Sequence, residues 1–280
     1  MALTLDLGGR TVVVTGGVRG VGAGISRAFL EAGADVVAVA RREPEEVPEA
    51  GGRAARFVPL DVRDPDAVQE FADGLDHLDV LVNNAGGGPY LPLAEGRLRT
   101  HVKIMELNLT APLIMARALR PKLLARGGGS VINIGSVSGV RPSPGSAAYG
   151  AAKAGLHSLT QSLAIEWAPH IRVNTLILGM VRTEASRTHY GDDEGIAAVG
   201  RTVPIGRLAD PYEVGATCVF LASDLASYVT GSSMQVHGGG ERPPFLDAAT
   251  VNKPPVNKPP VNEPSVNEPS ADQPPAPKES

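Results

Sequence analysis

The chain has 280 residues, of which 42% are apolar and 20% are charged, and its formal net charge is -4. This composition supports a sizeable core, and the length lies near the upper end for one α/β domain. The acidic balance and the lack of a dense basic cluster argue against nucleic acid or an anionic membrane surface as a partner. Cys218 is the only cysteine, so no disulfide within the chain is possible and a reducing compartment is expected.

The first residues lack the charged start, apolar stretch and cleavage site of a signal peptide. No apolar run approaches the roughly 20 residues that span a bilayer. We therefore expect a cytoplasmic protein without a membrane segment.

Short β-branched runs alternate with longer helical patterns, which is typical of βαβ units around a buried parallel sheet. The predicted strands are Thr11–Thr15, Asp35–Ala40, Arg56–Pro59, Val80–Asn83, Ser130–Ile134, Arg172–Leu178 and Met234–His237. The predicted helices are Gly20–Ala32, Asp64–Gly74, one long helix over His101–Ala125, Ala147–Trp167 and Pro211–Ala222. Right-handed crossovers then give an α/β fold, a doubly wound, Rossmann-like parallel sheet of about seven strands with helices on both faces.

Two segments are expected to lack such elements. Arg41–Ala55 is broken by Pro44, Pro48 and a glycine pair, which predicts a turn or at most a helical stub. From Val251 the sequence repeats every five residues and is rich in proline, which predicts a disordered, partly polyproline-II tail. We thus expect one domain over residues 1–246 and a tail over residues 247–280; a docking or spacer role for the tail is the alternative to a solvated segment.

A glycine-rich turn follows the first predicted strand. Gly16, Gly20 and Gly22 are spaced Gly-x3-Gly-x-Gly, with Arg19 and Val21 between them. Glycine permits a tight exit from the strand and lets main-chain amides approach a phosphate. The following helix directs about half a positive charge at that point. This pattern predicts a site for a dinucleotide pyrophosphate.

Tyr149 and Lys153 are four residues apart, thirteen residues and more after Ser136. One helical turn places the phenol and the ammonium on the same face. A free tyrosine has a pKa near 10, and a cation within reach lowers such a value by about 1–3 units. The pair therefore predicts an acid or base usable near neutral pH.

The motifs follow one another in a characteristic order: the glycine turn, Asn83-Asn84-Ala85-Gly86, Asn108, Ser136, and then Tyr149 with Lys153. In this order the chain resembles the short-chain dehydrogenase/reductase family, from about residue 5 to residue 240. The resemblance implies hydride transfer between a nicotinamide and a carbonyl or alcohol. It implies that Tyr149 moves the proton, that Lys153 also bonds the nicotinamide ribose, and that Ser136 bonds the substrate oxygen. Asn108 would hold a helix bend and a water of the proton relay.

The resemblance also assigns the cofactor contacts. It places Asp61 and Val62 beside the adenine, and Asn83 as a brace of the strand edge near the adenosine half. Ala85 and Gly86 would pass under the cofactor, and Val181 with Thr183 would bond the carboxamide. No metal ligands are predicted.

The type of nicotinamide cofactor depends on the end of the second strand, where NAD enzymes place a carboxylate. By the family's alignment that position is Ala40, and Arg41 follows it. An arginine there is suited to binding the 2′-phosphate of NADP, and Arg19 could bind the same phosphate from the other side. NADP(H) is therefore predicted. NAD(H) stays possible because Glu43 lies in the same short loop, and for Arg42 plain exposure is the expectation.

The substrate is a small carbonyl compound or alcohol, enclosed by a polar segment over Glu184–Leu208 that is expected to act as a lid. Arg141, Arg182 and Arg187 could bind a carboxylate or phosphate on a substrate. A second, less favoured substrate class is therefore the thioesters of an acyl carrier or coenzyme A. The leading hypothesis is an NADP(H)-dependent ketoreductase; the rivals are an NAD-dependent alcohol dehydrogenase and a non-catalytic, cofactor-sensing binding protein. The resemblance implies a homotetramer or dimer with contacts through Ala111–Ala125 and Ala147–Trp167.

Overall fold

The structure is a computed structural model that describes residues 5–249. The repeat segment from Val251, for which a disordered tail is predicted, lies outside the described residues. Contacts divide the chain into one unit over Met1–Glu241 and a second over Arg242–Ser280. The described part of the second unit holds one short helix, α9 (Pro244–Ala248), and all that follows concerns the first unit.

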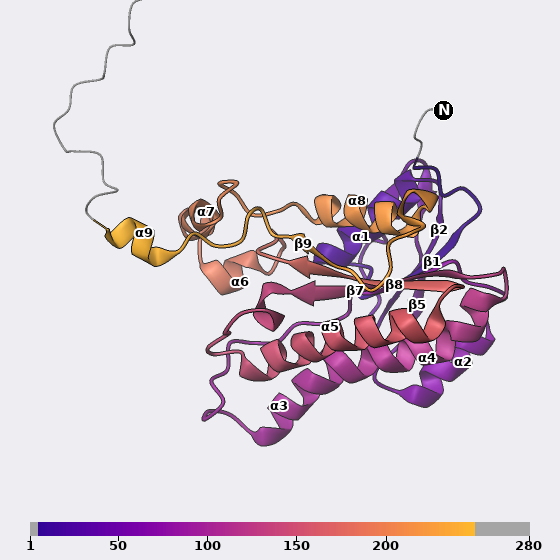
Figure 1. The fold of residues 1–280 in the computed structure, drawn as a ribbon, viewed down its shortest axis with the longest axis horizontal. Coiled ribbons are helices and arrows are strands. Elements are labelled where there is room, and N and C mark those ends of the chain that lie inside the picture. The colour runs from indigo at the N-terminus through magenta and orange to yellow at the C-terminus, as the bar shows by residue number, and fades with distance from the viewer. Residues whose placement is uncertain (1–4, 250–280) are drawn as a thin grey trace, which may run out of the picture. The chain divides into compact units, whose positions relative to one another are not determined.

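The centre of this unit is a seven-stranded sheet in the order β5-β2-β1-β6-β7-β8-β9 (Figure 1). Every neighbouring pair is parallel. The strands are β1 (Thr11–Thr15), β2 (Asp35–Ala40), β5 (Arg56–Pro59), β6 (Val80–Asn83), β7 (Gly129–Ser136), β8 (Ile171–Leu178) and β9 (Ser233–Val236). The predicted doubly wound parallel sheet is confirmed. Strand order reverses between β1 and β6, which is where such sheets bind ligands at their carboxyl edge.

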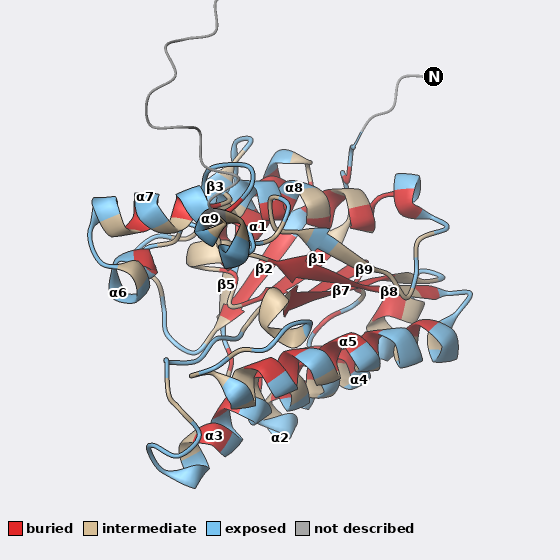
Figure 2. Cartoon of the chain, turned by 60° about the vertical axis from the view of Figure 1, so that its left-hand side comes forward, coloured by how far each residue is buried: buried red, intermediate tan, exposed pale blue. Residues whose placement is uncertain are grey.

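Helices cover both faces of the sheet (Figure 1). On one face lie α1 (Gly20–Glu31) and α8 (Pro211–Ala222), and on the other lie α2 (Pro65–Asp73), α4 (Ala111–Leu124) and α5 (Ala147–Trp167). The five inner strands are mostly buried between these layers, whereas the edge strands β5 and β9 are partly exposed and the helices expose their outer sides (Figure 2). The layers follow from the sequence because each strand is apolar on both sides and each of these helices has a face to bury.

Alternate residues of a strand enter different cores. Val12 and Val14 pack with Phe29 of α1, whereas Val13 packs with Leu119 of α4. This is the period of two expected for a strand covered on both faces. Cys218 is fully buried in the first core, and burial raises the pKa of its thiol, which is typical of a structural cysteine.

Two predicted elements differ from the structure. The long helix over His101–Ala125 is interrupted: α3 (Leu98–Met105) passes through a π-helical turn at Glu106–Thr110 before α4 begins. Residues 41–55 form neither a simple turn nor a helical stub, since they contain a two-residue hairpin of β3 (Glu49–Ala50) and β4 (Arg53–Ala54). Gly51 and Gly52 have φ of 59° and 72°, which suits a tight hairpin turn between the two strands.

The predicted lid segment contains two short helices, α6 (Ser186–Tyr190) and α7 (Asp193–Thr202). Short 3-10 turns follow β7 at Val137–Gly139 and α8 at Asp224–Ala226. Within residues 5–249, no helix combines the length and the hydropathy that crossing a membrane requires.

Candidate active site

The carboxyl edge of the sheet rests on a buried row of polar side chains. The Asn83 amide donates to Asn133 Oδ1 at 2.9 Å, and the Asn133 amide donates to Thr160 Oγ1 at 2.8 Å. Thr160 Oγ1 lies 2.7 Å from Thr175 Oγ1. The row joins β6, β7, β8 and helix α5 beneath the site. Asn83 also donates to the Pro112 carbonyl at 3.4 Å, so its side chain joins β6 to β7 and to the start of α4.

Ser136 and Tyr149 face one another at the end of β7 and the start of α5. Ser136 is the last residue of its strand, and its hydroxyl accepts a hydrogen bond of 3.1 Å from the Ser138 amide. Burial raises the pKa of the Tyr149 phenol, and a hydrogen bond with Ser136 opposes that rise. The expected lowering of this pKa by Lys153 does not appear, because desolvation of the half-buried phenol outweighs the other interactions.

Lys153 lies one turn further along α5 and is 3% exposed. Its Nζ donates a hydrogen bond of 2.7 Å to the Ile134 carbonyl and lies 5.6 Å from the centre of the Tyr149 ring. Burial lowers the pKa of the ammonium to about 8. The ammonium therefore lies close to the Tyr149 ring, and the lysine is largely charged at neutral pH.

Asn108 lies at the centre of the π-helical turn and is fully buried. Its amide group donates to the carbonyls of Ile104 at 2.8 Å and Gly87 at 2.9 Å, and its Oδ1 accepts from the Gly87 amide at 2.9 Å. The side chain thus holds both a helix bend and the loop after β6. π-helical turns are frequent at functional sites. A Cβ at Gly86 would lie 2.6 Å from Asn108 Oδ1 and 3.3 Å from Lys153 Nζ, so this position requires glycine.

The glycine turn is shaped to receive a phosphate. Gly16 and Gly20 have φ of 62° and 51°, and a Cβ at Gly22 would lie 2.0 Å from the Gly16 carbonyl oxygen. Arg19 occupies the N-cap of α1, and no side chain caps the first amides of this helix. Uncapped amides at a helix N-terminus bind anions readily. The turn therefore fits the pyrophosphate of a dinucleotide, with Val21 in its first helical turn.

Two residues outside the predicted site hold this turn against the loop after β6. Thr15 Oγ1 accepts hydrogen bonds of 2.9 Å from the amides of both Asn84 and Ala85. The Asn84 side chain donates to the Thr15 carbonyl at 2.8 Å. The sequence pattern includes Thr15 and Asn84 in its motifs but assigns them no role. Their position at the ends of β1 and β6, the two strands at which the strand order reverses, could have indicated one.

The segment after β8 closes the site from the other side. Val181 forms a parallel bridge with Ala209, and the Thr183 amide donates to Ser186 Oγ at 2.9 Å. A Cβ at Gly20 would lie 3.4 Å from the Thr183 methyl group. The segment predicted to contact the nicotinamide carboxamide therefore lies against the glycine turn.

Arg19 and Arg41 are both exposed, and within residues 5–249 neither forms an ion pair or a side-chain hydrogen bond to another residue. The Asp61 carboxylate, which the resemblance places beside the adenine, accepts hydrogen bonds from Arg63 Nε and Nη2 at 2.9 and 2.6 Å. This pair lowers the pKa of Asp61 to about 2, with a smaller contribution from Arg41. Val62 beside it is buried. The sequence pattern did not single out Arg63, which pairs with Asp61.

A histidine that the sequence did not single out lies behind the end of β7. His157 is 9% exposed, follows Lys153 by one turn, and its Nε2 has no hydrogen-bond partner within the described chain. A Cβ at Gly135 would lie 2.4 Å from this atom. Burial, and then the charge of Lys153, lower the pKa of the imidazole. The neutral ring packs behind the strand end that carries Ser136.

The loops over the site are joined to one another. The Leu91 amide donates to the Gly145 carbonyl at 2.7 Å, and a Cβ at Gly145 would fall 2.0 Å from the Tyr90 ring. Two of the three arginines considered for an anionic substrate are already paired: Arg141 with Glu241, and Arg187 with Asp193 at 3.0 Å. A cavity of about 680 Å³ adjoins these loops, with mainly apolar walls from Val140, Pro142, Pro144 and the outer alanines of α5.

Known proteins share this arrangement. A family model described as enoyl-(acyl carrier protein) reductase matches residues 16–241. The chain is 37% identical over 247 residues to 3beta-hydroxysteroid dehydrogenase 1 of Eggerthella lenta, over 84% of this chain and 94% of that protein. It is 34% identical over 242 residues to the 3-oxoacyl-(acyl-carrier-protein) reductase FabG of Vibrio cholerae, over 84% and 98%. The Pseudomonas aeruginosa RhlG/NADP complex superposes with a TM-score of 0.76 and 32% identity, over 85% and 99%.

The family match begins at Gly16 of the glycine turn and includes Ser136, Tyr149 and Lys153. The chain belongs to the short-chain dehydrogenase/reductase family. It is therefore an oxidoreductase of the class that acts on CH–OH or C=O groups with a nicotinamide cofactor.

Proposed function

We propose that this enzyme interconverts a ketone and a secondary alcohol with NADP(H), and that Ser136, Tyr149 and Lys153 carry the proton chemistry with Asn108 behind them. The observation that carries the proposal is the contact between the Ser136 hydroxyl and the Tyr149 phenol above the buried ammonium of Lys153. A hydroxyl pair of this kind positions a carbonyl oxygen, and a charge close to it favours the proton transfer.

In the direction of reduction the bound nicotinamide supplies the hydride. Tyr149 is protonated at neutral pH because burial raises its pKa, so the phenol donates the proton to the carbonyl oxygen. Ser136 donates a hydrogen bond to the same oxygen and stabilises its developing charge. The Lys153 ammonium, fixed by the Ile134 carbonyl, stabilises the tyrosinate that remains.

The cofactor residues are proposed on the same geometry. The glycine turn and the free amides of α1 would hold the pyrophosphate. Gly86, Lys153 and Thr183 would contact the nicotinamide half of the cofactor. Arg41 and Arg19 would take the 2′-phosphate, because both guanidinium groups are exposed and carry no carboxylate partner within the described chain. Structural relatives that bind NADP support this choice, and an NAD-dependent alcohol dehydrogenase is the alternative.

For the substrate we favour a neutral ketone or alcohol over an acyl-carrier or coenzyme A thioester. Arg141 and Arg187 already pair with Glu241 and Asp193, so less free positive charge is left for an anionic carrier. Because the relative FabG is named as a 3-oxoacyl-(acyl-carrier-protein) reductase, acyl thioesters are included among the substrates to be tested. The other rival, a non-catalytic cofactor-sensing protein, is disfavoured because all four proposed catalytic residues are present and assembled.

We also propose that the protein forms a homodimer or homotetramer and acts in the cytoplasm. Leu98, Val102, Met105 and Leu113 are each more than two-fifths exposed, and they form an apolar stripe along α3 and α4. Exposed apolar side chains in one stripe are typical of an interface between proteins. Gel filtration with light scattering is expected to give a dimer or a tetramer, and a monomer at micromolar concentration would contradict this part of the proposal.

The deciding experiment is a panel of neutral ketones and acyl thioesters tested with NADPH and NADH. We expect turnover of ketones with NADPH, and a loss of about 10²–10⁴-fold in kcat for Tyr149→Phe with little change in NADPH affinity. Tyr228→Phe is the matched control, since this tyrosine is fully exposed. Tight cofactor binding without turnover of any compound, or full activity of Tyr149→Phe, would refute the catalytic proposal.

A further inference from the structure

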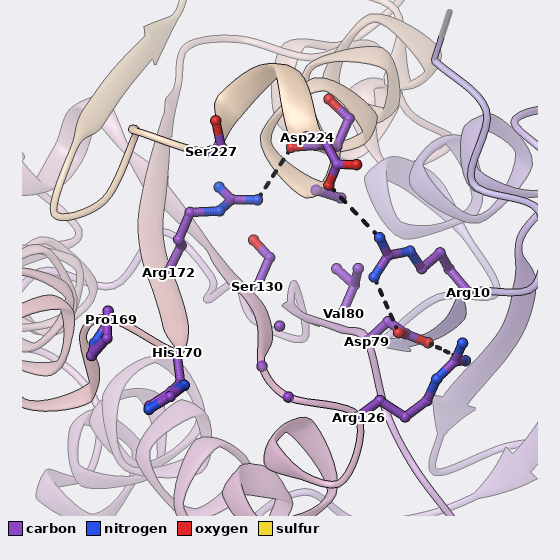
Figure 3. A pocket seen from close by; sticks show the side chains of 15 residues that line it. Arg10, Asp79, Val80, Arg126, Ser130, Pro169, His170, Arg172, Asp224 and Ser227 are labelled. Atoms are coloured by element: carbon purple, nitrogen blue, oxygen red, sulfur yellow. Dashed lines mark hydrogen bonds and ion pairs between the residues drawn. The ribbon is translucent and has the colours of Figure 1, made fainter.

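A second polar cavity lies at the amino edge of the sheet, opposite the candidate active site (Figure 3). Val80 and Ser130 in its wall are at the starts of β6 and β7, whereas Asn83 and Ser136 end these strands. At about 3.3 Å per residue, Ser130 lies roughly 20 Å from Ser136. A molecule bound in this cavity would therefore not touch the residues proposed to hold the cofactor and substrate.

Cations dominate the lining. The guanidinium groups of Arg10, Arg126 and Arg172 face two carboxylates, those of Asp79 and Asp224, and His170 lies at the rim (Figure 3). The volume of about 310 Å³ is at the small end of the range for ligand sites in proteins. A cavity of this size and charge suits a small oxyanion.

The two carboxylates differ in how firmly they are held. The Asp79 side chain is 2% exposed, accepts 2.8 Å from the Thr11 amide, and lies 3.3 and 3.6 Å from Arg10 and Arg126. This aspartate is part of the framework. The Asp224 side chain is 96% exposed and reaches Arg10 only at 3.7 Å. An exposed ion pair of that kind contributes little free energy, so an incoming anion can displace Asp224.

Arg172 supplies the second fixed cation. Its guanidinium is partly buried in the wall and donates to the carbonyls of Val229 and Ser223, both at 3.3 Å. Carbonyl oxygens orient the group but leave its charge uncompensated by an ion pair of its own. Without Asp224, the three guanidinium groups of Arg10, Arg126 and Arg172 would face the single carboxylate of Asp79, which leaves two positive charges that no carboxylate of the lining neutralises.

We propose that this cavity is a binding site for a phosphate-class oxyanion, free phosphate or a small phosphate monoester, in which the anion replaces the Asp224 carboxylate beside Arg10 and Arg172. Guanidinium groups bind phosphate oxygens through paired hydrogen bonds. The site would let a phosphorylated compound bind at the same time as the cofactor, from the opposite edge of the sheet.

The test is titration calorimetry of the full chain with inorganic phosphate and with glycerol 3-phosphate, at ionic strength held constant with KCl; glycerol is the uncharged control. We expect Arg10→Gln to weaken oxyanion binding about tenfold. Asp224→Asn is expected to tighten it about two- to fivefold, because a competing carboxylate is removed from an exposed pair that the fold does not need. Binding of glycerol 3-phosphate but not of inorganic phosphate, or the reverse, identifies which source of the phosphate group the site accepts.

Equal affinities in wild type, Arg10→Gln and Asp224→Asn would overturn the proposal, and so would glycerol binding as tightly as glycerol 3-phosphate. Phosphate could instead bind where Arg41 and Arg19 are proposed to hold the 2′-phosphate of the cofactor. In that case Arg41→Gln would abolish binding and Arg10→Gln would not, which also overturns the site. Because calorimetry needs no turnover, the result does not depend on the proposed enzymatic function.

Discussion

The Lys153 ammonium donates a hydrogen bond of 2.7 Å to the main-chain carbonyl of Ile134. Ile134 lies two residues before Ser136 on β7, and Lys153 lies one turn after Tyr149 on α5. A single buried cation therefore joins the two elements that carry the proposed acid and its partner hydroxyl.

The pH dependence of reduction is expected to follow this lysine. Burial lowers the pKa of Lys153 to about 8, so its charge is present below that pH and is lost as the pH rises through it. We expect kcat/KM for ketone reduction to fall above about pH 8, since this parameter reports the free enzyme. Lys153→Arg keeps the charge and should move the decline to higher pH. A flat wild-type profile up to pH 9.5 would show that the charge is not required.

Gly86→Ala tests the closeness of the loop after β6 to the catalytic residues. The added methyl group would meet Asn108 Oδ1 at 2.6 Å and Lys153 Nζ at 3.3 Å, so one of them must move. We expect kcat/KM to fall at least tenfold, because displacements of about 1 Å at a reacting site have effects of that size or more. Gly74→Ala is the control, since its nearest contact would be an ordinary 3.6 Å. Equal activity of the two variants would contradict the packing described.

Arg41→Gln tests the choice of cofactor. Loss of a charge-assisted hydrogen bond to a 2′-phosphate is expected to weaken NADPH binding roughly tenfold to a hundredfold and to leave NADH binding nearly unchanged. Arg42→Gln is the neighbouring control, for which exposure without contact is expected. Fluorescence titration measures both cofactors. A preference for NADH in wild type that survives Arg41→Gln would favour the NAD alternative.

Thr160→Val tests the buried polar row beneath the site. The threonine hydroxyl accepts from Asn133 at 2.8 Å and lies 2.7 Å from Thr175. Removing it leaves the Asn133 amide buried without an acceptor, which costs about 1–3 kcal/mol. Thr217→Val on α8 removes a hydroxyl bonded only to the carbonyl of its own helix and should cost less. Urea unfolding measures the free energy of both, and equal stability of the two variants would refute the role of the row.

Glu213 gives a stability prediction at acid pH. Arg207 binds it through two contacts of 2.7 Å, and these bonds lower the pKa of the carboxyl group to about 2, from 4.5. A carboxyl group whose pKa is lower in the folded protein than in the unfolded chain stabilises the fold at pH values above the unfolded pKa. This contribution is lost as the pH falls from about 4.5 to about 2. Because both side chains are about half exposed, Glu213→Gln should lower the melting temperature at pH 7 by only about 1–3 °C. The difference from wild type is expected to vanish near pH 2, whereas exposed Glu166→Gln should show no difference at either pH.

The sequence predicted the regular elements closely where the pattern was local. Thr11–Thr15, Asp35–Ala40 and Ala147–Trp167 have the predicted bounds, because a β-branched run or a long apolar face decides such elements by itself. The periodicity predicted one continuous helix over His101–Ala125, and only the family resemblance implied the bend at Asn108. It depends on hydrogen bonds from this side chain to Ile104 and to Gly87, which is 21 residues away, and no helical propensity shows such a contact.

The direction of the Tyr149 pKa was predicted incorrectly for the same kind of reason. Spacing alone shows that a cation lies one turn away, but burial of the phenol depends on the loops that cover it. Arg63 and His157 were missed because each takes its meaning from a partner brought in by folding: the Asp61 carboxylate for one, and the chain at Gly135 for the other. Neither residue belongs to a motif that could have been recognised in advance.

What the sequence alone determined is the alternation of strands and helices, the glycine turn and the order of the proposed catalytic residues, since these follow from local periodicity and from spacing along one helix. The tertiary structure decided which of these groups are desolvated, which cations are already neutralised and what stands at the opposite edge of the sheet. Burial and ion pairing act between residues that are distant along the chain, so they exist only once the seven strands have been assembled side by side.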